Sequence, residues 1–403
     1  MSVLLLGALL LWCCSATVEA GRNRSTPFLV DEEDALLTVP QLIRKYGYEV
    51  EEHQVRTEDG YLLTMYRIPA RHRGIRRYPV FMMHSLFSTS ADWVLIGRKH
   101  GLAYLLADRG YDIWMGNVRG NRYSRKHERH SITSKKFWDF SFHEMGAYDV
   151  PAFIDYVLEQ TGSRRLHYVG YSQGTLVIFI ALSERPELNE KIVQVQALSP
   201  AVYLQRAASL TINLLVATNE QIAAQLTANR IYEFLPHFEK QYYFFRSVCP
   251  SPTQTLCRLV IAEVAGGNTK NMGVKLLRIF TGHFPAGASV KQVQHYAQSF
   301  RDGTFQQYDY GDPEKNLLRY GSVQVPKYNL SRATVPVRSY YAYEDRVVNY
   351  LNVLQVQREL PNLVSSYAVP DKRFGHADFG YGKNVKEVLY DEVVMNVEQA
   401  DEL

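Results

Sequence analysis

Residues 170–174 read Gly-Tyr-Ser-Gln-Gly (GYSQG), which fits the pattern G-x-S-x-G. This pattern places a serine on a tight turn between a strand and a helix, with its hydroxyl exposed. The glycines allow the turn to close without clashes of Cβ atoms. An ordinary Gly/Ser turn would have the same letters, so the neighbouring segments must decide whether Ser172 is a nucleophile.

Apolar runs and helical patterns alternate on both sides of this stretch. Strands are predicted at 79–83, 111–115, 166–170, 192–199 and 335–343, and helices at 101–109, 145–160, 175–182 and 383–399. Such alternation predicts an α/β fold with a mostly parallel sheet flanked by helices. Ser172 then lies between a strand and a helix, as the motif requires, and we interpret it as a nucleophile.

The regular alternation stops between about residues 202 and 310, a region rich in aromatic and amphipathic stretches. We interpret 202–310 as an inserted cap or lid, and 21–201 with 311–403 as the core domain. About half of the aromatic and aliphatic side chains of the insertion are expected to form the cap's own small core, and the remainder an acyl-binding wall and a lid edge that meets the lipid surface: Phe234, Leu235, Tyr242, Tyr243, Phe244, Phe245, Leu276, Leu277, Ile279 and Phe280.

The first 20 residues have the pattern of a secretory signal. An apolar run at 3–12 precedes small residues, and cleavage is expected after Ala20. The run is too short to span a membrane, and no later stretch has 18 apolar residues, so no transmembrane segment is predicted. In a secreted chain, Asn23 and Asn329 would be glycosylation sites, because each begins an Asn-x-Ser sequon.

Cysteine content and charge limit the possible partners. Cys249 and Cys257 remain after removal of the signal, and they form either one disulfide or two free thiols. No group of residues has metal-ligand spacing, and no cofactor is expected. The net charge of +4 is too small to indicate a nucleic-acid partner.

A serine nucleophile needs a histidine base and a carboxylate that orients it. In chains with this motif the order is Ser, then Asp or Glu, then His. Asp345 follows the strand 335–343 and is the favoured acid, with Glu344 as its rival; His376 is the one histidine after Asp345. The oxyanion would be bound by the backbone N–H groups of Gln173 and of Leu86, which follows the early strand.

The chain resembles the family of gastric and lysosomal acid lipases from about residue 38 to its end. Several motifs carry the resemblance: Glu58-Asp59-Gly60-Tyr61-Leu62-Leu63, Trp114-Met115-Gly116-Asn117-Val118-Arg119-Gly120-Asn121, Ser124-Arg125-Lys126-His127, Phe137-Trp138-Asp139-Phe140-Ser141, Glu233-Phe234-Leu235-Pro236 and Pro285-Ala286-Gly287-Ala288-Ser289-Val290. The resemblance implies an α/β-hydrolase fold with a mobile lid over the active site. It also implies the triad Ser172, Asp345 and His376, the oxyanion donors Leu86 and Gln173, and a Cys249–Cys257 disulfide.

Three positions depart from the motifs of that family. Tyr171 replaces the His of G-H-S-Q-G, Ser85 replaces the Gly of H-G-L, and Tyr343-Glu344 replaces a Gly-Gly pair before the acid. None removes a catalytic group, but they bear on the pH optimum, the geometry of the oxyanion loop and the acyl preference.

The expected function is that of a secreted or lysosomal lipase acting at a lipid–water interface. It would cleave triacylglycerols or cholesteryl esters through an acyl-serine intermediate. Two alternatives are an esterase of small soluble esters that uses the same residues, and a hydrolase fold retained as a non-catalytic lipid-binding protein. The second alternative is the less favoured, because both the nucleophile and the base are present.

Overall fold

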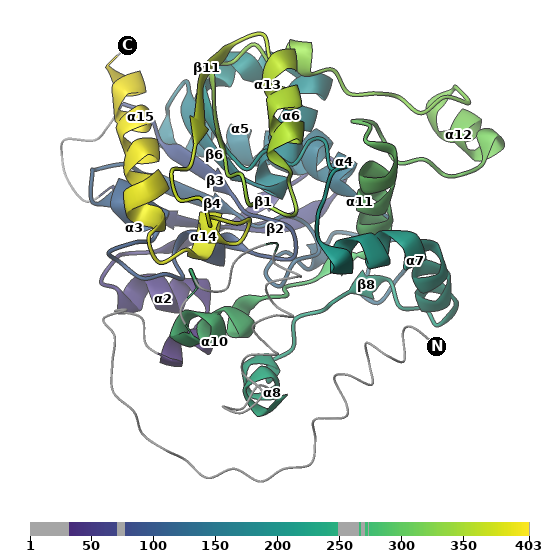
Figure 1. The fold of residues 1–403 in the computed structure, drawn as a ribbon, viewed down its shortest axis with the longest axis horizontal. Helices are drawn as coiled ribbons and strands as arrows, with labels where there is room; N and C mark the ends of the chain where they lie inside the picture. Colours follow the sequence, from purple (N-terminus) through teal and green to yellow (C-terminus); the bar gives the residue numbers. More distant parts are fainter. Residues whose placement is uncertain (1–31, 71–76, 249–265, 267–270, 273, 403) are drawn as a thin grey trace.

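The computed structural model describes residues 32–70, 77–248, 266, 271–272 and 274–402 (Figure 1). A large sheet crosses the molecule in the order β1-β2-β4-β3-β6-β7-β10-β11, with β5 paired to β2. Its strands are β1 (Glu51–Arg56), β2 (Tyr61–Ile68), β3 (Val80–Met83), β4 (Ile113–Gly116), β5 (Lys126–His127), β6 (Leu166–Tyr171), β7 (Ile192–Leu198), β10 (Val337–Tyr341) and β11 (Leu363–Ala368).

The sheet is parallel from β4 to β11 and antiparallel only where β2 pairs with β1, β4 and β5. The predicted mostly parallel sheet is therefore confirmed. The central strands β3, β4, β6 and β7 are buried on both faces, as parallel strands between helical layers are. On β3, Phe81 and Met83 pack into one apolar cluster, and Val80 and Met82 pack into a second cluster on the opposite face.

Helices cover both faces of the sheet. The helices are α2 (Val39–Lys45), α3 (Leu102–Ala107), α4 (Phe142–Glu144), α5 (Val150–Thr161), α6 (Gln173–Glu184), α7 (Leu210–Ala228), α8 (Gln241–Val248), α10 (Val274–His283), α11 (Val290–Asp302), α12 (Pro313–Tyr320), α13 (Tyr350–Glu359), α14 (Asp378–Tyr381) and α15 (Asp391–Asp401). Side chains of α5, α6 and α13 belong to the first cluster, and those of α2, α3 and α15 belong to the second.

Short 3-10 and π-helical turns complete the list of elements: η1 (Glu32–Ala35), η2 (Ser90–Trp93), η3 (Met145–Asp149), η4 (Pro186–Lys191), η5 (Leu330–Arg332) and η6 (Lys386–Tyr390). The helix predicted at 145–160 is thus a π-helical turn that continues into α5. Pro151 explains the change, because it has no N–H to donate to the preceding turn. The helix then ends at Gly162, whose φ of 65° is left-handed.

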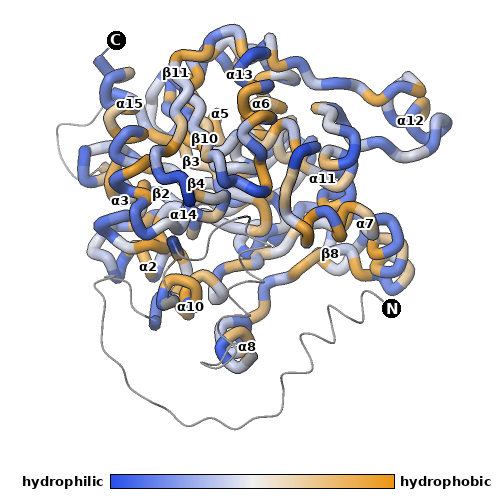
Figure 2. Tube along the Cα trace, viewed as in Figure 1, coloured by the Kyte–Doolittle hydropathy of each residue, from blue (hydrophilic) through white to orange (hydrophobic). Residues whose placement is uncertain are grey.

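The segment between β7 and β10 lies against the lower and right-hand sides of the core in Figure 1. It contains α7, α8, α10, α11, α12 and a small antiparallel sheet of β8 (Glu233–Phe234) and β9 (Ala288–Ser289). Figure 2 shows hydrophobic stretches that alternate with hydrophilic ones along α7, and α7 buries only Ala223. Apolar side chains therefore remain on the surface of α7.

Candidate active site

Ser172 lies at the junction between β6 and α6. Its φ of 52° and ψ of −111° are unusual for a residue with a side chain, and such strain is often found at functional sites. The backbone N–H of Ser172 donates to the carbonyl of Leu198 on the neighbouring strand, at 2.9 Å. The turn is thereby held at the carboxyl edge of the sheet, where ligands of α/β folds bind.

The two glycines of GYSQG are required by close packing of the backbone. A Cβ on Gly174 would lie 2.1 Å from the carbonyl oxygen of Met83, at the end of β3. A Cβ on Gly170 would lie 2.8 Å from the carbonyl of Gly174. Any side chain at either position would therefore push the start of α6 away from the sheet.

His376 connects Ser172 to Asp345 through a chain of hydrogen bonds. His376 Nε2 lies 2.9 Å from Ser172 Oγ, and His376 Nδ1 lies 2.8 Å from Asp345 Oδ2. A carboxylate beside Nδ1 favours the tautomer with the proton on Nδ1, which leaves Nε2 free to accept the serine proton. All three side chains are buried, at 6%, 8% and 3% exposure for Ser172, His376 and Asp345. The arrangement has the geometry needed for nucleophilic catalysis.

The two candidate carboxylates after β10 lie in different surroundings. Asp345 is buried, and its Oδ1 accepts from the backbone N–H groups of Val347 and Val348, at 2.9 and 2.8 Å. Glu344 is exposed. The structure thus brings Asp345, and not Glu344, to His376.

The expected oxyanion donors lie beside Ser172. Within the part of the chain that the structure describes, the backbone N–H groups of Leu86 and Gln173 have no protein acceptor. The loop that carries Leu86 is fixed by His84 and Asp92. His84 Nδ1 lies 2.7 Å from the carbonyl of Ser85, while Nε2 accepts from the N–H of Val118 at 3.2 Å. Burial lowers the pKa of His84, so its ring stays neutral, as these bonds require.

Two of the three departures from the acid-lipase motifs have partners in the site. Ser85 donates its N–H and its Oγ–H to Asp92 Oδ2, both at 2.8 Å, and so connects the loop that carries Leu86 to η2. Tyr171 donates its hydroxyl to the backbone carbonyl of His376 at 2.7 Å. This bond connects the turn of Ser172 to the loop of His376. Sequence patterns gave no sign of it, because the partners are 205 positions apart.

Ser199 is a further member of the site that the sequence did not reveal. It follows β7 directly, is fully buried and has a φ of 50°. Its Oγ donates to Asp345 Oδ2 at 2.7 Å and lies 3.2 Å from His376 Nδ1. Nothing in the local sequence Leu-Ser-Pro distinguishes this serine from a turn residue.

An apolar pocket with a cavity volume of about 170 Å³ opens beside Ser172 and His376. Helices α7 and α11 supply much of its wall, through Thr211, Ile212, Leu215, Val216, Asn219, Val293, Tyr296, Ala297 and Phe300. From the list of expected wall residues, Phe234 and Phe280 line the pocket. Of the others, Tyr242 and Ile279 are buried away from it, and Tyr243 and Phe244 are exposed.

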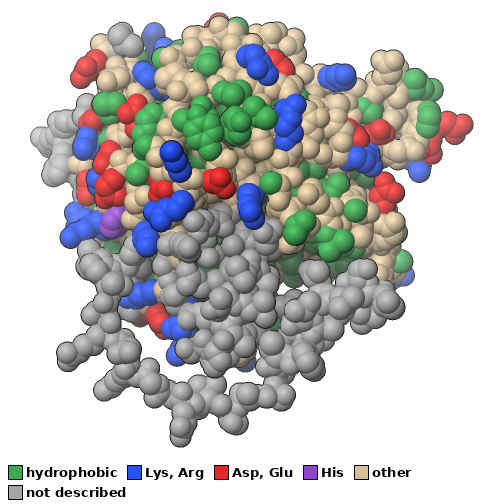
Figure 3. Space-filling model, in the orientation of Figure 1, with side chains coloured by type: hydrophobic (Ala, Val, Ile, Leu, Met, Phe, Trp, Pro, Cys, Tyr) green, Lys and Arg blue, Asp and Glu red, His purple; other side chains and the backbone are tan. Residues whose placement is uncertain are grey.

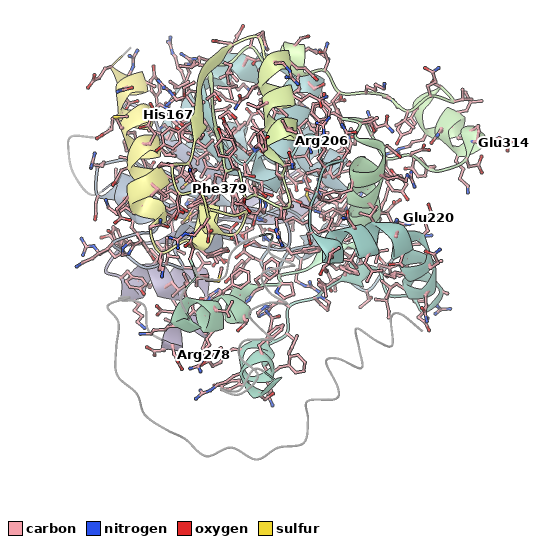
Figure 4. The ribbon with its side chains drawn as sticks, in the orientation of Figure 1. His167, Arg206, Glu220, Arg278, Glu314 and Phe379 are labelled. Carbon is pink, nitrogen blue, oxygen red and sulfur yellow. The ribbon has the colours of Figure 1, made fainter. Side chains whose placement is uncertain are left out.

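Side chains of α11 reach the turn that carries Ser172. The Gln173 side-chain oxygen accepts from Gln292 Nε2 at 2.6 Å and from the Tyr296 hydroxyl at 3.1 Å. Ala377 and Tyr381, after His376, also line the pocket, and Phe379 of the same helix α14 lies near the centre of the view in Figure 4. The candidate site is thus enclosed by the sheet edge, α11 and the loop before α14.

The remaining predicted sites are only partly visible. Asn329 is exposed, as glycosylation would require. Asn23, Cys249, Cys257 and the signal at 1–20 lie outside the described residues. Among the residues that are described, no cluster of three or more His, Cys, Asp or Glu side chains could hold a metal ion. No helix in this part of the chain is both long and apolar enough to cross a membrane.

Comparison with known proteins places this architecture in a family. Residues 78–380 match the α/β hydrolase fold, and residues 39–97 match the partial α/β-hydrolase lipase region. Lipase 1 of Drosophila melanogaster is 41% identical over 367 residues, which cover 89% of this chain and 79% of that protein. Gastric triacylglycerol lipase of Bos taurus is 36% identical over 367 residues, which cover 90% of this chain and 91% of that protein.

A solved structure from Sulfolobus solfataricus has a TM-score of 0.55 to this chain, at 12% identity. The superposition covers 87% of this chain and 94% of that one. A likeness at such low identity concerns the fold alone, whereas the sequence matches extend over nearly the whole described core. The chain therefore belongs to the lipases of the α/β-hydrolase family.

Proposed function

We propose that Ser172, His376 and Asp345 form the catalytic triad of an enzyme that hydrolyses the carboxylic esters of neutral lipids. The observation that carries this proposal is the unbroken chain of hydrogen bonds from Asp345 through His376 to Ser172, beside an apolar pocket. A serine activated in this way attacks an ester carbonyl, and the apolar pocket provides space for the acyl chain.

The proposed reaction has two halves that use the same groups. His376 Nε2 takes the proton of Ser172 as Oγ attacks the ester carbonyl, and Asp345 stabilises the imidazolium that forms. The backbone N–H groups of Leu86 and Gln173 bind the oxyanion. His376 then gives the proton to the leaving alcohol, which leaves an acyl-serine. Water activated by His376 releases the fatty acid and restores Ser172.

The pocket favours esters with long acyl chains. Burial of each CH₂ group contributes about 0.8 kcal/mol, so an apolar wall discriminates between long and short chains. Triacylglycerols and cholesteryl esters both meet this requirement, and two of the relatives carry the name lipase or triacylglycerol lipase. We assign residues 202–310 to a cap that supplies most of this wall.

The enzyme is proposed to act at a lipid–water interface outside the cytoplasm. Leu210 and Leu214 on α7 are 77% and 48% exposed, next to the pocket-lining face of the same helix. In Figure 3, hydrophobic side chains are visible on this part of the surface. Secretion or delivery to lysosomes through the signal at 1–20, glycosylation at Asn23 and Asn329, and a Cys249–Cys257 disulfide belong to the same proposal.

Labelling with a phosphonate ester tests the proposed nucleophile. We expect covalent labelling of Ser172 in the unchanged protein and none in Ser172→Ala. Activity on emulsified triolein should then exceed activity on a soluble butyrate ester. Preference for the butyrate ester would indicate an esterase of small substrates, and absence of labelling would indicate a non-catalytic lipid-binding protein.

A further inference from the structure

The hydroxyl of Ser199 is placed to act on the charge of the proposed triad. Its Oγ donates to Asp345 Oδ2 at 2.7 Å, the same oxygen that lies 2.8 Å from His376 Nδ1. The other oxygen, Oδ1, accepts from the backbone N–H groups of Val347 and Val348. The carboxylate therefore receives four hydrogen bonds, which is close to its full capacity as an acceptor.

The backbone conformation of Ser199 is energetically unfavourable for a residue with a side chain. Its φ of 50° lies in the left-handed region, which a residue with a side chain rarely adopts outside a functional or tightly constrained site. Its backbone N–H donates to the carbonyl of Tyr340 at 2.8 Å, so the turn after β7 is fixed to β10. That turn directs the hydroxyl towards Asp345, and neither residue is among those that line the pocket.

We propose that Ser199 is a positioning residue that keeps His376 active as a base at lower pH. A hydroxyl that donates to Asp345 withdraws part of the negative charge that would otherwise stabilise the imidazolium. With a weaker partner, the neutral imidazole persists at lower pH and can still accept the proton of Ser172. The inference rests on the proposed function, because it concerns the same three catalytic groups.

The other titratable groups around His376 do not donate a hydrogen bond to Asp345, as Ser199 does. Tyr171, at the end of β6, directs its hydroxyl to the backbone carbonyl of His376. Asp378 of α14 accepts from the N–H of Gly375 at 2.8 Å and interacts with Asp345 only through space. Asp92 of η2 acts electrostatically on Tyr171 and accepts hydrogen bonds from Ser85. Ser199 alone among these groups donates to the carboxylate of Asp345.

The test compares the pH dependence of kcat/KM in Ser199→Ala and Ser199→Gly with that of the unchanged enzyme, on a soluble ester. Both variants lose the hydroxyl, but glycine tolerates the positive φ, so the pair separates the chemical effect from strain. We expect the acid limb to move to higher pH by about half to one unit in both. Activity should therefore fall more at acid than at neutral pH.

Ser339→Ala is the matched control, because Ser339 is a buried serine on β10 that bonds to Gln357 and not to the triad. Its acid limb should stay in place. An unmoved limb in both Ser199 variants, or an equal loss at every pH, would overturn the inference. Failure of phosphonate to label Ser172 in the unchanged protein would overturn the proposed function, and this inference with it.

Discussion

At the scale of single residues, Asp345 and Glu344 are neighbours with opposite exposures. Asp345→Asn should lower turnover on the order of 10⁴-fold, because an amide in that place favours the wrong tautomer of His376. Glu344→Gln should change turnover less than about twofold, because that side chain is exposed. Steady-state rates of the two variants on one ester show which carboxylate orients His376. A larger loss of turnover in Glu344→Gln than in Asp345→Asn would assign that role to Glu344.

The proposed nucleophile gives a second prediction. Ser172→Ala should lower turnover on the order of 10⁶-fold. The fold should be retained, because the turn depends on the backbone bond to Leu198 and on the two glycines. Circular dichroism and thermal unfolding check the fold, and ester hydrolysis checks the activity. Purified variant protein that kept more than a few per cent of activity would contradict the assignment.

The hydroxyl of Tyr171 connects the turn of the proposed nucleophile Ser172 to the loop of His376. Tyr171→Phe should lower kcat roughly 3- to 30-fold with little change in KM, since small displacements of catalytic groups are costly. Tyr390→Phe is the control. Its hydroxyl also donates to a buried backbone carbonyl, that of Phe379, but it does not contact the triad. If the two substitutions lowered kcat equally, Tyr171 would contribute to the stability of the fold and not to the placement of His376.

At the scale of elements, α7 carries apolar side chains on two sides. Ile212 and Leu215 line the pocket, while Leu210 and Leu214 are exposed. Replacing Leu210 and Leu214 by Ser should lower activity on emulsified long-chain triacylglycerol on the order of 10-fold, because an interfacial helix binds through its apolar area. Activity on a soluble butyrate ester should stay within about twofold.

Helix α12 offers a control for this experiment. Leu317 and Leu318 are 50% and 88% exposed, but they line no part of the pocket. Figure 4 places Glu314 of α12 and Glu220 of α7 in separate regions of the surface. Replacing Leu317 and Leu318 by Ser should leave the ratio of the two activities unchanged. An equal fall on both substrates after the α7 substitutions would show that α7 has only a structural role.

The elements of the core could be predicted from sequence because their signals are local. The strand before GYSQG and the apolar run after it placed Ser172 on the turn between β6 and α6. The pocket wall could not be predicted in this way. The sequence predicted a core, a wall and a lid edge among ten apolar residues of the insertion but did not say which residue takes which place: Phe234 and Phe280 line the pocket, Tyr243 and Phe244 are exposed, and α7 and α11 supply much of the wall. Which apolar side chain faces a pocket depends on tertiary packing and cannot be predicted from the composition of a segment.

Ser199 shows the same limit within the site itself. Its contact with Asp345 joins residues 146 positions apart. Its φ of 50° is not predicted by the residues that flank it in the sequence. The order Ser, Asp, His was accessible because the fold constrains it. A supporting hydroxyl has no such constraint, so only the three-dimensional arrangement identifies it. The boundaries of the cap at 202 and 310 stay a prediction.

At the scale of the whole molecule, two buried groups have opposite effects on stability as the pH falls. Burial lowers the pKa of His283 to about 4, while its Nε2–H donates to the carbonyl of Asp34. Between the unfolded value of about 6.5 and about 4, the unfolded chain binds this proton and the folded chain does not. Stability contributed by the neutral His283 is therefore lost in this window, by about 1.4 kcal/mol for each pH unit.

Asp378 acts in the other direction. Burial raises its pKa to about 7, against the opposing hydrogen bond from Gly375. Between about pH 7 and the unfolded value of about 3.9, the folded chain binds the proton and the unfolded chain does not. This group therefore adds stability as the pH falls, and it offsets the loss at His283 over most of the same window.

Because His283 and Asp378 have opposite effects, substitutions at the two positions should change the pH dependence of the unfolding free energy in opposite directions. The loss of unfolding free energy between about pH 7 and about pH 4.5 should become larger in Asp378→Asn, because the offset is removed. It should become smaller in His283→Gln, because an amide donor can replace the imidazole N–H without titrating. Urea unfolding of both variants and of the unchanged protein at the two pH values measures these differences directly.

The comparison is between pH values within each variant, so a loss of stability that is the same at both pH values cancels. If both variants lost stability to the same extent as the unchanged protein, neither buried group would control the acid tolerance of the fold.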